Sequence, residues 1–283
     1  MALFLIKNRV SKQKIELTLP ADLKYSSLLR QISEAFFLYA GFTKEWSGRL
    51  KLVVDELFMN AIRYGSKSEG SLVHMSYQFD NDEISYRIED EGGGDKKVIA
   101  EELKKVIHRN SDEANILNKT SGRGLALISS LWTDSMVVED SQYGGIAVTF
   151  SKKISSENPP APSPSVHETR VFPQAVTETG KLSPVVLKGP TEVIRISGEI
   201  DQSNLEKKTE LITETVTRLP VESTLVLDCR ELVYINSTFI GHLAAWLNDI
   251  QAKNGQLVLR NTNKEIRDVL SLVGLSKVLY LES

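Results

Sequence analysis

Cysteine is almost absent from the sequence, since Cys229 is the single one, and this excludes an internal disulfide or a cysteine-cluster metal site. No apolar run reaches the roughly 18 residues that a membrane span needs. Neither sign of charge dominates, because 34 Lys and Arg face 37 Asp and Glu, which argues against a nucleic-acid binder. The first ten residues lack a basic lead and a cleavage site. We therefore expect no signal peptide, no membrane association and a cytoplasmic location.

Proline is scarce outside one stretch, since seven of the nine prolines lie between Pro159 and Pro190. That stretch is also rich in serine and shows no apolar period of a strand or a helix. Proline removes backbone donors, and the composition buries too little apolar area to offset the entropy of ordering. We predict an extended linker at residues 153–189, between a domain at 1–152 and a domain at 190–283.

Apolar spacing predicts a two-layer α/β architecture in both domains, with helices covering a sheet that is mixed in the first domain and mostly parallel or mixed in the second. In the first domain we expect strands at 14–19, 71–79, 83–89, 135–140 and 145–151, and helices at 22–39 and after Thr43. In the second we expect strands at 192–196, 225–227, 256–259 and 278–281, and helices at 205–219, 239–251 and 264–272. The strand at 225–227 should end near Asp228, with a loop before the next helix.

Two segments of the first domain carry residues suited to binding a nucleotide. Glu56 and Asn60 stand four residues apart, so on a helix they project from one face, one turn from each other. Asp90 follows a predicted strand and precedes a glycine run that includes Gly92 and Gly94. Glycines allow a sharp turn and let the backbone approach a ligand closely. Taken singly, each pattern is more typical of a solvated helix face or a loop.

A third segment runs into a helix, and its residues are Ser121, Gly122, Arg123, Gly124 and Leu125. A helix start offers unpaired N–H groups and a positive dipole end to a phosphate. The preceding polar stretch, residues 95–120, has the composition of a lid. The order of the three segments on their predicted elements is much more specific than any one of them.

With these three segments in this order, the first domain resembles the Bergerat-fold ATPases of the GHKL superfamily and, more narrowly, the bacterial anti-sigma-factor serine/threonine kinases. The resemblance implies ATP and Mg²⁺ as cofactors, with Asn60 as the metal ligand and Glu56 as the catalytic base. Asp90 would accept the adenine amine, and Gly92 and Gly94 would make room for the base. The third segment would close on the phosphates. Arg30 matches an arginine with which that family contacts protein partners.

Two other branches of the superfamily fit less well. A histidine kinase needs an acceptor histidine on a long helix before the ATPase domain. His167 lies after that domain, in the proline-rich stretch, and lacks helical periodicity around it. An ATPase of the gyrase or repair type would need an adjoining transducer domain, for which the sequence shows no pattern.

The second domain resembles the STAS domain of anti-sigma-factor antagonists. Residues 198–201 match that family's early turn, and residues 236–241 match the segment that carries its phosphorylated serine, which falls on Ser237. Asn236 stands where the family has Asp, and Phe239 where it has Gly. The amide could weaken recognition by a kinase, and the phenyl ring could hinder approach or add an apolar docking knob. Ser237 is thus either a phosphoacceptor or the cap of a helix in a STAS domain used for docking.

We therefore expect a serine/threonine kinase of the anti-sigma type in a partner-switching system. Its partners would be a STAS-domain antagonist, a sigma factor or equivalent regulator, and a serine phosphatase, without direct nucleic-acid binding. The fused STAS domain could act as an internal competitor or be phosphorylated in cis or in trans. Family relatives also suggest a homodimer through the kinase domain. The alternative is a nucleotide-regulated binding switch without significant phosphotransfer, in which the STAS domain serves as a dock.

Overall fold

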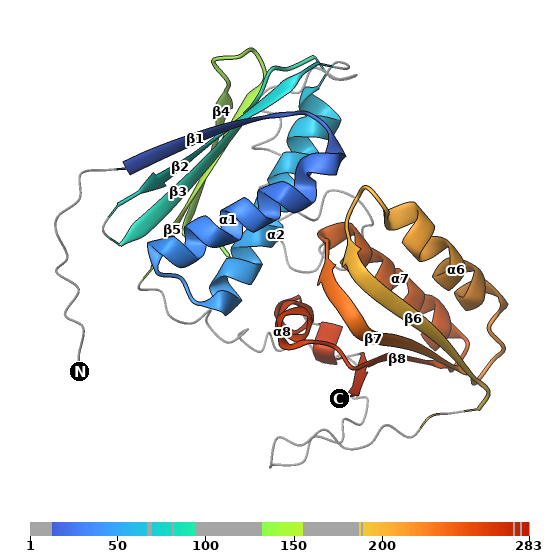
Figure 1. The fold of residues 1–283 in the computed structure, drawn as a ribbon. Coiled ribbons are helices and arrows are strands. Elements are labelled where there is room, and N and C mark those ends of the chain that lie inside the picture. The colour runs from blue at the N-terminus through green and yellow to red at the C-terminus, as the bar shows by residue number, and fades with distance from the viewer. Residues whose placement is uncertain are drawn as a thin grey trace, which may run out of the picture. The chain divides into compact units, whose positions relative to one another are not determined.

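The computed structural model describes residues 13–66, 70–80, 82–93, 132–154, 187, 189–273, 275–277 and 279–282, which form two compact units (Figure 1). Most of the linker predicted at 153–189 lies outside the described residues, and its boundaries stay a prediction. Across the described ranges, no helix has both the length and the apolar character needed to cross a membrane.

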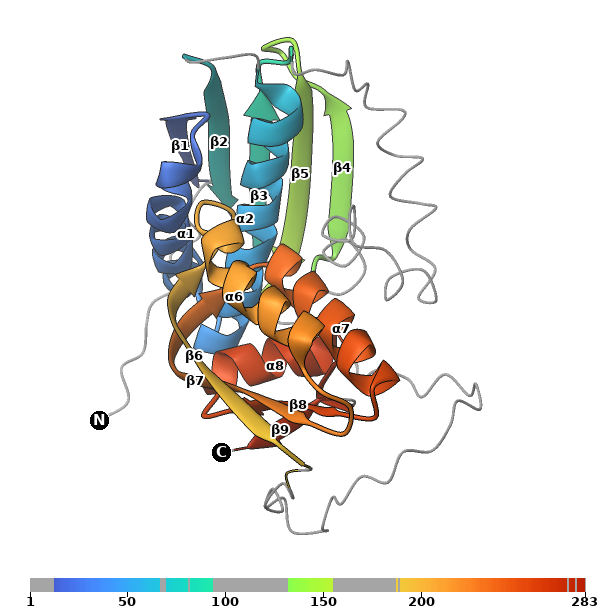
Figure 2. The ribbon, with the colours of Figure 1, turned by 90° about the vertical axis from the view of Figure 1, so that its right-hand side faces the viewer.

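The first unit is a five-stranded sheet with two long helices on one face (Figure 2). Its elements are β1 (Gln13–Pro20), η1 (Leu23–Tyr25), α1 (Ser26–Ala40), α2 (Lys44–Gly65), β2 (Leu72–Phe79), β3 (Glu83–Asp90), β4 (Ser135–Asp140) and β5 (Ile146–Lys153). The strand order is β1-β2-β3-β5-β4. The α/β sandwich is confirmed, but each neighbouring pair of these strands is antiparallel and the sheet is not mixed. Short hairpins join β2 to β3 and β4 to β5, and a short hairpin can join only antiparallel strands.

The break between α1 and α2 follows from local chemistry that the sequence predicts. Gly41 ends α1 in the left-handed conformation, with φ of +104°, and its N–H donates to the carbonyls of Leu38 and Phe37. Thr43 then caps α2, because its Oγ1 accepts from the N–H of Trp46 at 3.3 Å. The chain therefore turns within three residues and lays the second helix beside the first.

An aromatic row joins this helical layer to the sheet. Tyr77 of β2 lies opposite Tyr86 of β3, and Tyr86 lies opposite Phe150 of β5. Their ring centroids are 4.9 and 5.4 Å apart, and Phe37 of α1 extends the row at 6.3 Å from Tyr77. All four side chains are fully buried. Offset and edge contacts of this kind add to the stabilisation that apolar burial supplies.

The second unit is a four-stranded parallel sheet in the order β6-β7-β8-β9, with helices between the strands. Its elements are β6 (Thr191–Ile200), α6 (Leu205–Arg218), β7 (Thr224–Ile235), α7 (Ser237–Ala252), β8 (Gln256–Arg260), α8 (Lys264–Leu272), η2 (Leu275–Lys277) and β9 (Tyr280–Glu282). The strand expected to end near Asp228 instead continues to Ile235. Pairing with β6 resumes after irregularities at Ser197 and Glu199, so the expected loop is a bulged strand.

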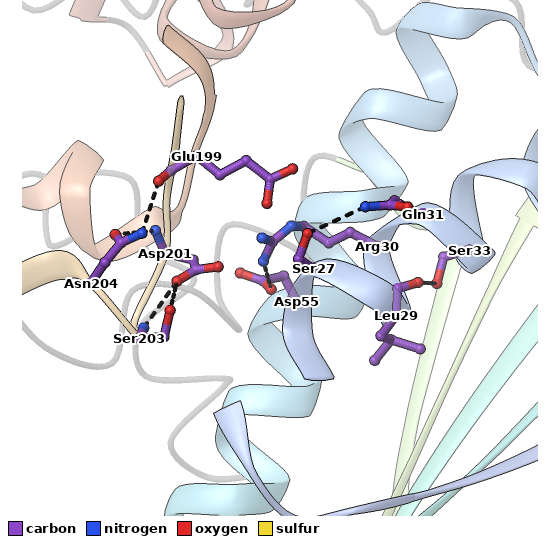
Figure 3. Close-up of polar contacts among 10 residues, drawn as sticks. All are labelled: Ser27, Leu29, Arg30, Gln31, Ser33, Asp55, Glu199, Asp201, Ser203 and Asn204. Carbon is purple, nitrogen blue, oxygen red and sulfur yellow. Dashed lines mark hydrogen bonds and ion pairs between the residues drawn. The ribbon is translucent and has the colours of Figure 1, made fainter. Parts of the chain in front are cut away.

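Two hydroxyl groups tie α1 to β2 inside the core of the first unit. Ser33 Oγ donates to the carbonyl of Leu29 at 2.7 Å (Figure 3). Ser33 Oγ also lies 2.6 Å from the hydroxyl of Tyr77, which must be the donor in that pair because the serine proton is already used. Burial raises the pKa of Tyr77 well above its ordinary value. The tyrosine is therefore a neutral donor at physiological pH.

We predict that Ser33→Ala destabilises the first unit more than Tyr77→Phe does. The alanine leaves the tyrosine hydroxyl buried without its acceptor, which costs about 1–3 kcal/mol in the free energy of unfolding. The phenylalanine removes the donor but leaves serine bonded to Leu29, so we expect a loss of only about 1 kcal/mol. Denaturant unfolding of both variants checks this, and a larger loss in Tyr77→Phe would contradict the donor assignment.

Candidate functional site

Asp90 is a buried carboxylate at the end of β3, and one of its oxygens is fixed by the backbone. The N–H of Gly92 donates to Oδ1 at 2.9 Å, and the N–H of Ile146 at the start of β5 donates to the same atom at 3.2 Å. Within the described residues, both hydrogen bonds to this carboxylate end on Oδ1, which leaves Oδ2 to accept from another donor. Burial raises the pKa of Asp90, and the two N–H groups oppose that rise.

Three glycines surround this carboxylate so closely that no side chain fits at their positions. A Cβ on Gly65, the last residue of α2, would lie 2.1 Å from Cγ of Asp90. A Cβ on Gly145 would lie 1.8 Å from its Oδ1, and one on Gly92 would lie 2.5 Å from the carbonyl oxygen of Gly144. Gly92 also has a φ of +71°, which favours glycine. These glycines form a backbone cradle around Asp90.

Gly65 and Gly145 are site residues that we did not predict from the sequence. Gly65 closes the segment that carries Glu56 and Asn60, and Gly145 belongs to the Gly144-Gly145 pair before β5. A glycine at a helix end and a glycine pair in a hairpin have ordinary turn roles. Only their approach to Asp90 in the folded unit shows that they have a further role.

Asn60 and Glu56 lie on α2, and Asn60 is the nearer of the two, along the helix, to the end that touches Asp90. Both side chains are half-buried. Nδ2 of Asn60 is enclosed and has no hydrogen-bond partner among the described residues. Gly65, Asn60 and Glu56 follow one another back along the helix, and the nine residue steps from Gly65 to Glu56 correspond to about 13.5 Å at the rise of an α-helix. The predicted site residues of α2 thus share the helix whose end touches Asp90.

Glu91, which follows Asp90, fixes the turn after β3 through contacts with β2. Its Oε2 accepts from the N–H of Leu72 at 3.0 Å, and its Oε1 lies 3.3 Å from Nε2 of His74. The His74 ring stacks on Tyr143, with 3.7 Å between centroids. These contacts lower the pKa of Glu91, the hydrogen bond from Leu72 most of all. The turn after β3 is therefore tied to β2 and to the β4–β5 hairpin.

Arg30 has a partner inside its own unit. Its Nη1 donates to Oδ1 of Asp55 at 2.6 Å, which joins α1 to α2 (Figure 3). Asp55 directly precedes Glu56, so this ion pair fixes the helix at the residue beside the candidate base. Contact of Arg30 with another protein stays a prediction. The predicted site residues Gly94, Ser121, Gly122, Arg123, Gly124 and Leu125 lie outside the described residues.

In the second unit, the residues around Ser237 form the start of α7. Asn236 caps the helix, because its Oδ1 accepts from the N–H of Phe239 at 2.9 Å, and Ser237 is the first helical residue and half-buried. Phe239 is fully buried and packs edge-to-face on Trp246, with 5.7 Å between centroids. The interpretation of Phe239 as a docking knob is therefore wrong, because the ring lies in the core.

Residues 198–201, which match the early turn of the STAS family, lie next to this helix start. Asp201 Oδ1 accepts from the N–H of Ser203 at 3.0 Å, and Asn204 Nδ2 donates to the carbonyl of Glu199 at 2.9 Å (Figure 3). The N–H of Asn236 donates to the carbonyl of Ile200 at 3.0 Å. Side-chain bonds of this type fix a tight turn before a helix. The end of β6 and the start of α7 are thereby held together.

Comparison with known proteins identifies both units. Residues 19–152 match the family model of the histidine kinase-like ATPase domain, and residues 184–283 match that of the STAS domain. The serine-protein kinase RsbW of Staphylococcus epidermidis is 30% identical over 146 residues, which cover 50% of this chain and 88% of the relative. The RsbW of Staphylococcus aureus strain RF122 is 28% identical over 145 residues, with the same coverage.

Among solved structures, the unphosphorylated anti-sigma factor antagonist SpoIIAA is 22% identical to this chain. The match covers 36% of this chain and 87% of that one, with a TM-score of 0.29. The family models and the RsbW relatives carry the assignment. The chain therefore belongs to the family of anti-sigma-factor serine-protein kinases, and it joins a histidine kinase-like ATPase domain to a STAS domain in one polypeptide.

Proposed function

We propose that this chain is an ATP-dependent serine/threonine kinase of the anti-sigma type that phosphorylates a STAS-domain serine, its own Ser237 or that of a partner. The observation that carries the proposal is the buried carboxylate of Asp90 in its glycine cradle, against the end of the helix that carries Asn60 and Glu56. A binding group for adenine at the end of β3 thus stands against the helix that carries a metal ligand and a base.

Asp90 would select adenine. Its Oδ2 can accept a hydrogen bond from the exocyclic amine of adenine, whereas guanine presents a carbonyl oxygen at that position and would be repelled. The glycine cradle supports this role, since it lets the backbone close on the carboxylate and hold it in one position. The carboxylate must be ionised to accept the amine. Because burial raises its pKa, we expect affinity for adenine to fall in acid earlier than an ordinary aspartate would dictate.

Asn60 would supply a protein oxygen to Mg²⁺. Its amide nitrogen, Nδ2, has no partner among the described residues, so no hydrogen bond from that atom holds the side chain in another role. The described residues contain no cluster of three His, Cys, Asp or Glu side chains that could hold a metal ion by themselves. Magnesium commonly relies on one or two protein ligands together with phosphates and waters, so one amide oxygen is compatible with such a site. Bound Mg²⁺ would neutralise charge on the phosphates during transfer.

Glu56 would be the general base. It is half-buried and lies one helical turn from Asn60, on the side away from Asp90. There it can accept the proton that a serine hydroxyl releases as the phosphoryl group is transferred. Asp55 cannot take this role, because its carboxylate already pairs with Arg30 in the helical layer.

The STAS unit and outside partners would complete a switch. A fused STAS domain is present at an effective concentration of about millimolar when the linker can span the two sites. It would then compete with, or replace, a separate STAS antagonist for the kinase. We further propose a sigma factor or an equivalent regulator as the held target, a serine phosphatase as the resetting enzyme, a homodimer through the kinase domain, and a cytoplasmic location.

We predict that Gly65→Ala weakens the binding of ATP and ADP by more than tenfold, because the new Cβ would displace the carboxylate of Asp90. Gly48→Ala is the matched control on the same helix, since its Cβ meets nothing within 4 Å. The control should keep its affinity and gain about 0.5–1 kcal/mol of stability. Calorimetric titration measures the nucleotide affinity of both variants, and denaturant unfolding measures the stability of the control. Equal affinities for the two variants would refute the role of the cradle.

We predict that Glu56→Gln lowers phosphate transfer by about 10²–10⁴-fold while nucleotide affinity stays unchanged, since a general base contributes roughly that factor. Glu45→Gln, at the exposed start of the same helix, is the control and should transfer at the full rate. Mass spectrometry after incubation with Mg-ATP locates the phosphate, and Ser237→Ala shows whether Ser237 takes it. Full transfer by Glu56→Gln would remove the assigned base. Nucleotide binding without any transfer would favour the binding switch.

A further inference from the structure

The amide of Asn236 has a donor that the folded chain leaves unused. A backbone N–H can only donate, so the atom that faces Phe239 at 2.9 Å is the oxygen and the other terminal atom is the nitrogen. That nitrogen, Nδ2, is enclosed and has no hydrogen-bond partner among the described residues. The residue as a whole is 1% exposed, so bulk water does not replace the missing partner.

Other asparagines of the same unit use their amide donors. Asn263 caps α8 in the same way, with Oδ1 accepting from Ile266 at 2.8 Å, and its Nδ2 donates to the carbonyl of Leu232 at 3.0 Å. Asn204 Nδ2 donates to Glu199, and Asn261 Nδ2 donates to Asp228. The unpaired amide nitrogen therefore distinguishes Asn236 from these three asparagines.

Helix capping alone does not account for an amide at position 236. Aspartate, asparagine and serine cap a helix about equally well, because capping needs only an oxygen that accepts from the first turn. Aspartate would cap α7 without leaving a buried donor unpaired, and an unpaired buried donor costs free energy. The amide thus leaves its donor unpaired in the chain as it stands, unless an acceptor is added nearby.

Ser237, the next residue, is where such an acceptor would be added. A phosphate on its hydroxyl would bring three acceptor oxygens and almost two negative charges to the start of α7. The first N–H groups of a 16-residue helix and its positive dipole end already favour an anion there. The enclosed donor of Asn236, on the residue directly before Ser237, is a second and independent feature that calls for an acceptor.

We propose that Nδ2 of Asn236 donates a hydrogen bond to a phosphate carried by Ser237, so that Asn236 is a positioning residue that stabilises the phosphorylated STAS unit. This inference rests on the proposed function, which supplies the phosphate. Aspartate at the same position would face that phosphate with a like charge. Asparagine at position 236, where the family has aspartate, would therefore favour the phosphorylated state of the STAS unit. This is the opposite of the weakened kinase recognition that the amide could cause.

Asp201 is the acidic group next to this site. It follows Ile200 as Asn236 follows Ile235, and these two isoleucines are register partners in β6 and β7. Its Oδ1 is occupied by the N–H and the hydroxyl of Ser203. Its charge acts equally on any variant of position 236, so a difference between such variants comes from position 236 itself.

The test uses the full chain with phosphoserine placed at position 237 during translation, which makes it independent of kinase activity. The second pKa of the phosphate is followed by ³¹P NMR in the parent chain, in Asn236→Asp and in Asn263→Asp. The last is the matched control, because it adds the same charge at another helix cap of the unit. We expect Asn236→Asp to raise that pKa by about one pH unit, and Asn263→Asp to leave it unchanged. Equal titration in the two variants would overturn the proposal.

A second measurement tests whether phosphorylation changes the stability of the chain. The denaturation midpoint is compared with and without phosphate in each background. The phosphate should raise the midpoint, or lower it least, when Asn236 is present, and lower it clearly in Asn236→Asp. The same change in both backgrounds would also overturn the proposal. If these two measurements contradict the role of Asn236, the proposed kinase activity still stands. If mass spectrometry after incubation with Mg-ATP finds no phosphate on any STAS serine, only the proposed function is overturned.

Discussion

Two backbone N–H groups converge on one oxygen of Asp90, and the candidate nucleotide site depends on that arrangement. They come from the turn after β3 and from the start of β5, so the carboxylate can lie here only when the two strands are paired. By occupying Oδ1 they define which oxygen remains for a ligand. The close approach of Gly65 and Gly145 completes the arrangement, because any side chain at either position would displace the carboxylate.

Helix α2 connects this carboxylate to the rest of the unit and is held at both ends. Near its start, the ring of Trp46 contacts two cations, with Arg49 Cζ 4.8 Å and Lys152 Nζ 4.5 Å from the ring centroid. At its other end, Gly65 touches Asp90. The buried side chains between them set the rotation of the helix, and that rotation fixes the face on which Asn60 and Glu56 lie.

The start of α7 in the second unit is equally well supported. Trp246 Nε1 donates to Thr213 Oγ1 of α6 at 3.2 Å, which holds the two helices side by side (Figure 1). Lys253 donates to three carbonyls near the end of α6, those of Val216, Thr217 and Leu219, at 2.9, 2.8 and 3.0 Å. A lysine at a helix C-terminus satisfies unpaired carbonyls and complements the helix dipole. The helix that presents Ser237 is thus fixed along its length.

The sequence by itself determined the elements and the pattern of chemistry. Apolar periodicity placed most of the described strands and helices close to their observed bounds, and Gly41, Thr43 and Asn236 marked helix ends, because these signals act within a few residues. It also placed Glu56 and Asn60 on one helical face. Tertiary structure alone decided the antiparallel pairing of the first sheet, the extension of β7 to Ile235, the burial of Phe239 and the approach of Gly65 and Gly145 to Asp90. These features join residues far apart in the chain, and only the packed fold brings their atoms into contact.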